Sequence, residues 1–281
     1  MFASVPTGRI IGRIAYPSQP ICEQSVLWCW LFFDHRGSTR SAHVPPDSEK
    51  TPARLENRLL AALPTRDRRL ILSRSEPVEL RRGEVISEPG ERIRNAYFPT
   101  DCFLSLVTPP ADHSGLEVRL VGNEGMIGTP LILGVEITQI RTFVQGAGPA
   151  WRLSNEGFHE ALRQSEALEA RLHCYLDVLM NQCTQLLACT RFHLVEARLA
   201  RWLLMSQDRA HSDHFHVTHE ILALLLGVRR VGVTKAASAL QARELIHYRR
   251  GEITVLNRAG LQGTACGCYG AAEALYEQVL G

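Results

Sequence analysis

The segment from Val217 to Leu256 constrains the fold of this chain more than any other part of the sequence. Thr218 is a candidate N-cap for a short helix that ends at Leu226. Gly227 follows at the place where a tight turn between two helices needs a residue that tolerates a positive φ. A second helix is expected from about Arg229 to Ala242. The order of helix, glycine turn and helix predicts a helix-turn-helix.

The second of these helices has two faces of different chemistry. Small apolar residues on the inward face allow close packing on the first helix. The outward face offers guanidinium, ammonium, hydroxyl and methyl groups, which can read base edges and phosphates in a major groove. The inward residues are Val233, Ala236, Ala237 and Leu240, and the outward residues are Arg230, Val231, Thr234 and Lys235.

A basic hairpin is predicted directly after these helices, in the stretch LIHYRRGEITVL. Gly251 lies in its turn, and Arg249 and Arg250 lie near its tip. A hairpin of this charge after a helix-turn-helix is a wing that contacts backbone phosphate. The whole segment therefore predicts double-stranded DNA as the partner.

The distribution of charge agrees with this interpretation. The whole chain of 281 residues has a net charge of only +2. Residues 53–189 carry 15 Arg against 17 acidic residues, whereas residues 190–262 carry 11 Lys and Arg against 6 Asp and Glu. A basic C-terminal third on a near-neutral body is expected when one domain faces phosphates.

The sequence before the basic segment changes its pattern twice. RLENRLLAALP predicts a short amphipathic helix that ends at Pro64. Between Val78 and Leu153, short β-rich segments such as FLSLV and LEVRLV alternate with glycines, which indicates an antiparallel roll or sandwich. After Ser154 the pattern becomes helical.

One of the helices after Ser154 carries an apolar seam with alternating spacings of four and three residues. The seam residues are Leu168, Leu172, Tyr175, Leu179, Gln182 and Leu186. The spacing favours a two-chain interface, in which the polar Gln182 fixes the register. Packing of the same seam on the roll is the alternative.

With these motifs the chain resembles the Crp/Fnr family of bacterial regulators over about residues 53–270. The family's Thr, the Gly nine positions later and an Arg-containing recognition helix are matched by Thr218, Gly227, Arg230 and Lys235. The resemblance implies that Arg230, Val231 and Lys235 contact bases. It places contacts to the DNA backbone at Thr218, Arg229, Gly232, Thr234, Arg249 and Arg250.

The resemblance also implies a fold class, α+β, with three parts. These are an N-terminal double-stranded β-helix (jelly-roll) sensor domain of the cyclic-nucleotide-binding type, a long dimerisation helix and a C-terminal winged helix-turn-helix. The expected boundaries are 1–52 for a disordered extension, 53–164 for the sensor domain, 165–189 for the dimerisation helix, 190–262 for the DNA-binding domain and 263–281 for a tail. A cytoplasmic homodimer that contacts RNA polymerase is expected. Val231 stands where relatives carry Glu, which predicts an operator different from the family's commonest one.

The sensor domain departs from the cyclic-nucleotide binders of the family. These place Gly-Glu at a phosphate-binding turn and an Arg about ten residues later. Here Gly128 is followed by Thr129, Gln139 stands where the Arg is expected, and Arg141 lies two residues further along. Because the charged bonds to a cyclic phosphate are lost, cyclic AMP is not expected as the effector. An effector pocket at these four residues is predicted, with an unknown ligand and no cofactor.

No metal site is predicted from the cysteines and histidines. Cys266-Gly-Cys268 is too tight for two good ligands on one metal, so we interpret it as a packing feature. Histidines gather between His211 and His219. We interpret them as part of a solvated or capping loop, with a chelating pair of His214 and His216 as the alternative.

Other classes of protein are disfavoured by missing motifs. The sequence has no GxSxG, Walker, HExxH or CxxC motif, so an enzyme is not expected. The longest apolar run near the N-terminus, Val26 to Phe33, is far shorter than the roughly 20 residues that span a bilayer, so no membrane partner is expected. A membrane-touching patch from Trp28 to Phe33 is the alternative. The alternative function is a ligand-binding or interaction module whose helix-turn-helix mediates protein contacts.

Overall fold

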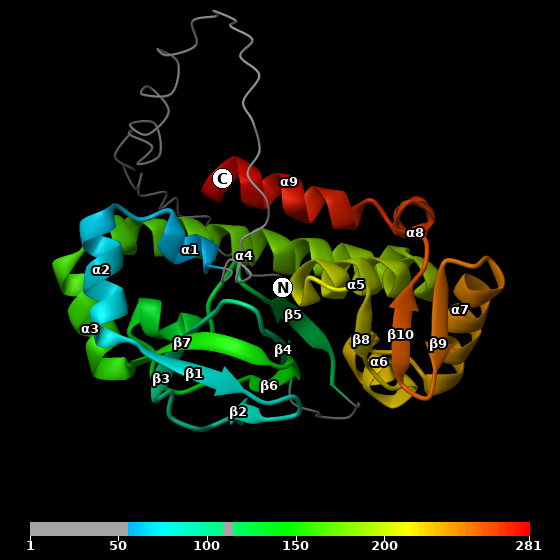
Figure 1. Cartoon of the computed structure of the whole chain (residues 1–281), viewed down its shortest axis with the longest axis horizontal. Coiled ribbons are helices and arrows are strands. Elements are labelled where there is room, and N and C mark those ends of the chain that lie inside the picture. The colour runs from blue at the N-terminus through cyan, green and yellow to red at the C-terminus, as the bar shows by residue number, and fades with distance from the viewer. Residues whose placement is uncertain (1–55, 109–114) are drawn as a thin grey trace, which may run out of the picture. The chain divides into compact units, whose positions relative to one another are not determined.

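The glycine-punctuated segments between residues 76 and 154 form two antiparallel sheets, as the sequence predicts (Figure 1). The structure is a computed structural model that describes residues 56–108 and 115–281, all of which lie in one unit, Pro52–Gly281. The predicted N-terminal extension, residues 1–52, lies outside the described residues.

The two sheets face each other across a shared apolar layer. One sheet has the strand order β1-β7-β3 and the other has the order β2-β6-β4-β5. The strands are β1 (Glu76–Leu80), β2 (Val85–Ser87), β3 (Asn95–Pro99), β4 (Phe103–Val107), β5 (Glu117–Val121), β6 (Arg141–Gly146) and β7 (Gly148–Ser154). Residues from both sheets, among them Leu80, Leu104, Val121 and Ala150, form one buried cluster. We refer to these strands together as the roll.

Two short helices precede the roll, and only the first is foreseen by the sequence. α1 (Arg58–Ala61) is a single turn, and α2 (Thr65–Arg74) follows Pro64. Asn57 is buried and caps α1, and its side-chain amide donates to the Pro99 carbonyl at 3.0 Å. Tertiary contacts at Asn57 therefore fix where α1 begins.

The predicted dimerisation helix is present, but most of the predicted seam packs inside the chain. α3 (Asn155–Gln164) is followed by α4 (Glu166–Phe192), which Ser165 caps. The first four seam residues, Leu168, Leu172, Tyr175 and Leu179, are buried in a cluster with Phe98, Met126 and Leu153 of the roll. Gln182 and Leu186 are half-buried. The prediction of this seam as the two-chain interface is therefore corrected: burying it against the roll already satisfies its apolar side chains.

The C-terminal part is a winged helix-turn-helix. Its elements are α5 (Val195–Ala210), β8 (His214–His216), α6 (His219–Leu226), α7 (Arg230–Ala242), β9 (Ile246–Arg249), β10 (Glu252–Val255) and α8 (Arg258–Thr264). The three strands form a small antiparallel sheet in the order β8-β10-β9. Leu203, Leu222, Val233 and Ile253 belong to the buried core that joins its helices to this sheet.

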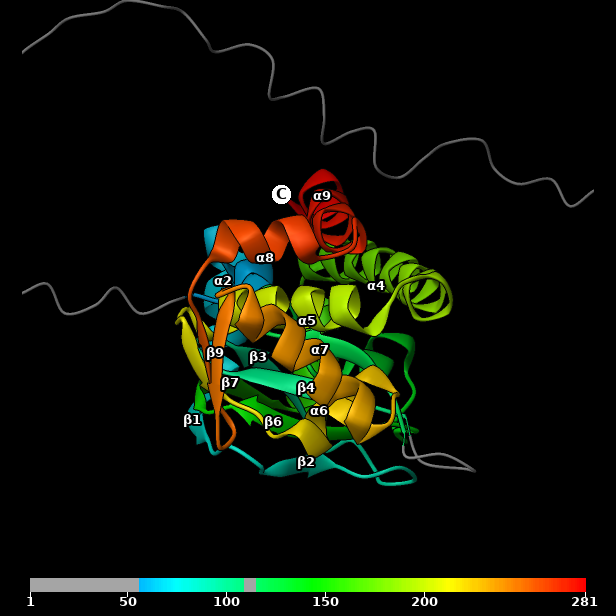
Figure 2. The same cartoon turned by 90° about the vertical axis from the view of Figure 1, so that its right-hand side faces the viewer.

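The last residues form a helix rather than the expected tail. α9 (Cys268–Leu280) lies along α4 in both views of the molecule (Figures 1 and 2). Tyr276 and Leu280 join the buried cluster of α4, and Arg171 of α4 donates to the Leu280 carbonyl at 2.6 Å. None of the helices in the described ranges combines the length and hydropathy needed to cross a membrane.

Candidate nucleic-acid interface

The turn of the helix-turn-helix is built as its sequence signals predict. The Thr218 hydroxyl accepts a hydrogen bond from the Ile221 backbone N–H at 3.2 Å, and Gly227 ends α6 at a φ of 61°. A Cβ at Gly227 would lie 2.8 Å from the Leu116 side chain. Both the positive φ and the close packing therefore require glycine at this position. With both ends capped, α6 has a fixed length and direction beside α7.

The two predicted faces of α7 differ sharply in exposure. The buried set is Val233, Ala236, Ala237 and Leu240, and the exposed set is Arg230, Val231, Thr234 and Lys235. Val231 leaves 59% of its surface open to solvent. The outward face is thus open to solvent within the described chain and has the shape and chemistry to enter a groove.

Contacts with α6 order two of the outward side chains. Arg230 Nη1 lies 2.9 Å from Glu220 Oε1 in an exposed ion pair. The Thr234 hydroxyl donates to the Arg230 carbonyl at 3.1 Å and lies 3.1 Å from His219 Nδ1. Burial, and then the charge of Arg230, lowers the pKa of His219. Because an exposed ion pair contributes only about 0–1 kcal/mol, a base or phosphate can replace Glu220 at small cost.

The N-terminus of α7 carries the remaining predicted contacts of this helix. Arg229 is its N-cap residue and is exposed. Gly232 has open space where a Cβ would stand, with no described atom within 4 Å. Unpaired N–H groups and the helix dipole make this end of α7 favourable for phosphate oxygens.

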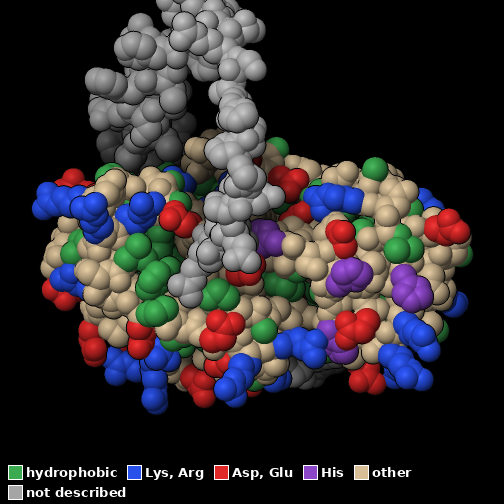
Figure 3. All heavy atoms as spheres, in the orientation of Figure 1, with side chains coloured by type: hydrophobic (Ala, Val, Ile, Leu, Met, Phe, Trp, Pro, Cys, Tyr) green, Lys and Arg blue, Asp and Glu red, His purple; other side chains and the backbone are tan. Residues whose placement is uncertain are grey.

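The wing is a two-residue hairpin with a basic tip. Arg249 pairs with Glu252, and Arg250 and Gly251 between them have φ values of 54° and 87°. Two consecutive positive φ values define the turn type that matches the twist of a tight hairpin. Arg249 and Arg250 are exposed, and Figure 3 shows basic and histidine side chains gathered over the part that holds β8, β9 and β10.

The histidines before the helix-turn-helix belong to separate contacts. His214 Nδ1 lies 2.9 Å from the Thr254 hydroxyl, and His216 Nδ1 lies 2.6 Å from Glu252 Oε1. His219 stacks on the Tyr248 ring with centroids 4.4 Å apart. These partners lie along the wing, so the side chains are arranged to brace the three-stranded sheet.

A buried hydrogen bond joins the roll to the winged helix-turn-helix. Trp202 Nε1 of α5 donates to Glu117 Oε2 of β5 at 2.7 Å. Burial raises the pKa of Glu117 to about 7, against the lowering effect of its hydrogen bonds with Ser105 and Trp202 and of the charges on Arg201 and Arg209. The two residues are 85 positions apart in the sequence, and no local pattern marks either of them.

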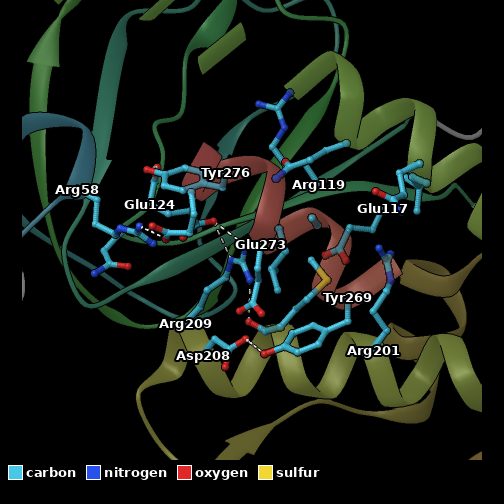
Figure 4. Close-up of a pocket in the computed structure, with 18 of the residues that line it drawn as sticks. Arg58, Glu117, Arg119, Glu124, Arg201, Asp208, Arg209, Tyr269, Glu273 and Tyr276 are labelled. Atoms are coloured by element: carbon cyan, nitrogen blue, oxygen red, sulfur yellow. Dashed lines mark hydrogen bonds and ion pairs between the residues drawn. The ribbon is translucent and has the colours of Figure 1, made fainter. Parts of the chain in front are cut away.

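An ion pair lines the same cavity as Glu117 (Figure 4). Glu124 Oε1 accepts from Arg209 Nη2 at 2.7 Å and from Arg209 Nε at 2.9 Å, and both side chains are largely buried. The cavity has a volume of about 550 Å³ and is lined from β5, α4, α5 and α9. Arg119 and Tyr276 are among its walls. A change in the roll can therefore reach α5 through two direct side-chain contacts.

A second cavity, of about 720 Å³, lies in the roll at the predicted effector pocket. Gly128, Thr129 and Gln139 line it. Thr129 opens the 3-10 helix η2 (Thr129–Leu133), and Gly128 before it has a φ of 93°. Arg141 is not among the lining residues and pairs with Glu88 at 3.4 Å. The structure thus brings together three of the four predicted pocket residues.

Comparison with known proteins agrees with this arrangement. Residues 197–264 match the Crp-like helix-turn-helix domain. The sequence matches no curated protein. Solved structures that share the fold at low identity include the following three.

A candidate Crp/Fnr-family transcriptional regulator from Eubacterium rectale ATCC 33656 aligns with a TM-score of 0.59 at 16% identity, covering 73% of this chain and 96% of that one. CLP, the c-di-GMP responsive global regulator from Xanthomonas campestris, has a TM-score of 0.56 at 17% identity, covering 68% and 99%. A CRP/FNR-family regulator from Thermus thermophilus has a TM-score of 0.56 at 22% identity, covering 68% and 98%.

The roll, the long helix and the winged helix-turn-helix define the class of protein. The chain has the α+β fold of Crp/Fnr transcription regulators and carries a Crp-like helix-turn-helix domain. The fold class and the resemblance predicted from the sequence are confirmed.

Proposed function

We propose that this chain is a dimeric, sequence-specific DNA-binding transcription regulator that reads a pseudo-palindromic operator through α7. The observation that carries the proposal is the exposed face of α7, where Arg230, Val231 and Lys235 project outward beside a basic wing. This is the arrangement in which a recognition helix lies in the major groove and the wing touches phosphate.

Each outward side chain has a distinct task in this proposal. Arg230 donates to the O6 and N7 acceptors of guanine once it leaves Glu220, and Lys235 donates to a further base acceptor. Val231 contacts a thymine methyl group, since it has no acceptor for the cytosine amino group. Arg249, Arg250 and the N-terminus of α7 fix the register on the backbone. Thr218, Gly232 and Thr234 lie in or beside α7 and would approach the same phosphates.

A different face of α4 from the predicted seam supplies the dimer contact. Leu176, Met180, Cys183 and Leu187 follow one another at spacings of four, three and four residues. Met180 is 64% exposed and Leu187 is 70% exposed. Large apolar side chains that are exposed at this spacing along a helix favour packing against a second chain. Pairing of two chains along this stripe places two recognition helices on one side of the duplex, about 34 Å apart for successive major-groove turns.

The cavity in the roll is the proposed effector site. Cys183 of the dimer stripe lines it together with Gly128 and Gln139, so a bound ligand would touch both the roll and α4. Arg119 also lines it, and its Nη1 atom is buried without a hydrogen bond to any described residue, which favours a ligand with an anionic group. Ligand binding would shift the population between two dimer states with different spacing of the recognition helices. An activated dimer would then contact RNA polymerase.

Selection of DNA sites from a random pool tests the proposal directly. Purified full-length protein is used at near-physiological salt, with no added ligand. Enrichment of a two-fold-symmetric site supports a dimeric regulator that reads sequence. Absence of enrichment, with salt-sensitive binding to every sequence alike across a screen of anionic ligands, would contradict sequence reading and favour a module that uses its helix-turn-helix for protein contacts.

A further inference from the structure

Three cysteines and one histidine meet at the junction of α4, α5, α8 and α9. Cys189 lies in the last turn of α4, and His193 directly follows that helix. Cys266 and Cys268 lie between α8 and the first turn of α9. One ligand atom from each of the four residues lies within 4.8 Å of all the others. Segments more than 70 positions apart in the sequence therefore converge on a single point.

The distances within this cluster are those around one ion. Cys189 Sγ lies 3.6 Å from Cys266 Sγ, and Cys268 Sγ lies 3.5 Å from His193 Nδ1. A tetrahedral zinc ion with bonds of about 2.3 Å to sulfur and about 2.1 Å to nitrogen sets its ligand atoms roughly 3.6–3.8 Å apart. Both contacts match these edges within a few tenths of an ångström, and the remaining pairs, all within 4.8 Å, would close by at most about 1 Å on metal binding.

Neither a disulfide nor apolar packing alone explains all the features of this cluster. A disulfide needs sulfur atoms about 2.05 Å apart, and the three cysteines are free. Apolar packing explains buried thiols but not the imidazole nitrogen that faces one of them. The short spacing of Cys266 and Cys268 argues against two ligands on one metal when only the sequence is considered. In the structure the turn at the start of α9 nevertheless brings both thiols into the same cluster.

We propose that Cys189, His193, Cys266 and Cys268 bind one thiophilic divalent cation of the zinc class. Three cysteines and one histidine form a closed set of ligands, which is typical of a structural zinc site. Soft thiolate ligands disfavour magnesium and calcium. With three thiolates the occupied site has a net charge of −1, and Arg201, which interacts electrostatically with Cys189 and Cys266, offsets it.

The position of the site implies a structural role for the ion. It ties the end of α4 to the turn between α8 and α9, at the point where the long helix is followed by α5 of the DNA-binding part. Metal binding would stabilise α9 on α4 and fix the junction, because the ligand groups come from both segments. The inference does not depend on which operator or effector the protein uses.

Metal analysis of the full-length protein tests the site. The protein is purified without a histidine tag or chelator, and its zinc content is measured by mass spectrometry of the elements. After removal of zinc, Co²⁺ is added, and tetrahedral thiolate coordination is read from charge-transfer and intense visible absorption bands. We expect one metal ion per chain. The Cys266→Ser and Cys268→Ser variants should lose the metal and the cobalt bands, whereas the control Cys174→Ser, elsewhere on α4, should keep both.

A second measurement, thiol alkylation of the unchanged protein, tests the site even if the cysteine variants fail to fold. In the native protein, alkylation of Cys189, Cys266 and Cys268 should be slow until a strong chelator is added, while Cys174 should react at the same rate in both conditions. The proposal is overturned if reduced protein takes up no zinc and shows no cobalt bands. It is equally overturned if the double variant Cys266→Ser/Cys268→Ser retains a full equivalent of metal.

Discussion

Trp202 of α5 donates a 2.7 Å hydrogen bond to the buried carboxyl group of Glu117 in β5. This contact links the roll to the first helix of the DNA-binding part. Burial raises the pKa of Glu117 to about 7, above its usual value of 4.5. The link therefore changes its charge near physiological pH, which makes the junction sensitive to protonation.

Replacement of Glu117 by Gln should remove a pH-dependent part of the stability. Between about pH 4.5 and pH 7 the folded protein holds a proton that the unfolded chain has released, so stability falls as pH rises through this window. The rise of the Glu117 pKa from 4.5 to about 7 corresponds to about 3 kcal/mol of folding stability that is lost across this pH window. Glu117→Gln keeps an acceptor for Trp202 but does not ionise. The urea concentration at the unfolding midpoint of Glu117→Gln should therefore rise relative to that of the unchanged protein as pH increases from 5 to 8.

A matched control uses another carboxyl group of the roll. Glu79 is exposed in β1, and Glu79→Gln makes the same chemical change outside the buried contact. An equal change in pH dependence for both variants would show that the Glu117–Trp202 contact is not its source.

Arg230→Ala should weaken binding to the selected operator by about 1–3 kcal/mol and relax the preference at one base pair of each half-site. The physical reason is the loss of a two-point donor to guanine, which no neighbouring side chain of α7 replaces. Quantitative binding to a panel of operators with single base changes measures the effect. The control Arg69→Ala removes the same charge from an exposed position of α2. Unaltered base preference in Arg230→Ala would show that another face of the protein reads the sequence.

Arg249→Ala should weaken binding to specific and random DNA alike. Arg249 is exposed at the wing beside the hairpin turn, where it would meet phosphate rather than bases. Loss of one phosphate contact reduces the slope of log K against log salt concentration by about 1. Binding titrations between low and moderate salt measure this slope. A variant with an unchanged slope but altered base preference would place the wing in a groove instead.

The helix-turn-helix was predictable because its signals are local. Thr218 caps the helix that follows it, Gly227 forms the turn beside it, and the alternation of Val233 and Thr234 reports the two faces of one helix. The glycine-separated strands of the roll were predictable for the same reason. Each signal acts within a few residues of itself, so one sequence is enough to find it.

The seam on α4 shows what periodicity leaves open. The spacing of Leu168, Leu172 and Tyr175 correctly marks a buried face, but it does not say what buries it. In the structure the roll covers that face. Met180 and Leu187, on a neighbouring face of the same helix, are exposed instead. Which of the two faces of α4 is buried within the chain depends on where the roll packs, and the spacing of apolar residues does not contain this information.

The contacts that join distant segments could not be predicted from the sequence. Glu117 and Trp202 meet across 85 positions, and Cys189 and Cys266 meet across 77. The expected tail instead forms α9, and its packing on α4 brings Cys266 and Cys268 to the end of that helix. Such pairs are set by how the elements pack and leave no mark in local composition or period.

Met180→Glu should separate the proposed dimer, because it places a charge in the centre of the proposed stripe of α4. Met180 is 64% exposed in the single chain, so the change disturbs little packing within it, and the cost falls on the interface. The control Asn181→Glu adds a charge one position along, on a side of α4 that carries no apolar stripe. Sedimentation should show a monomer for Met180→Glu and a dimer for Asn181→Glu, with operator affinity lost only in the first. If both variants stay dimeric, the two chains pair through some other surface.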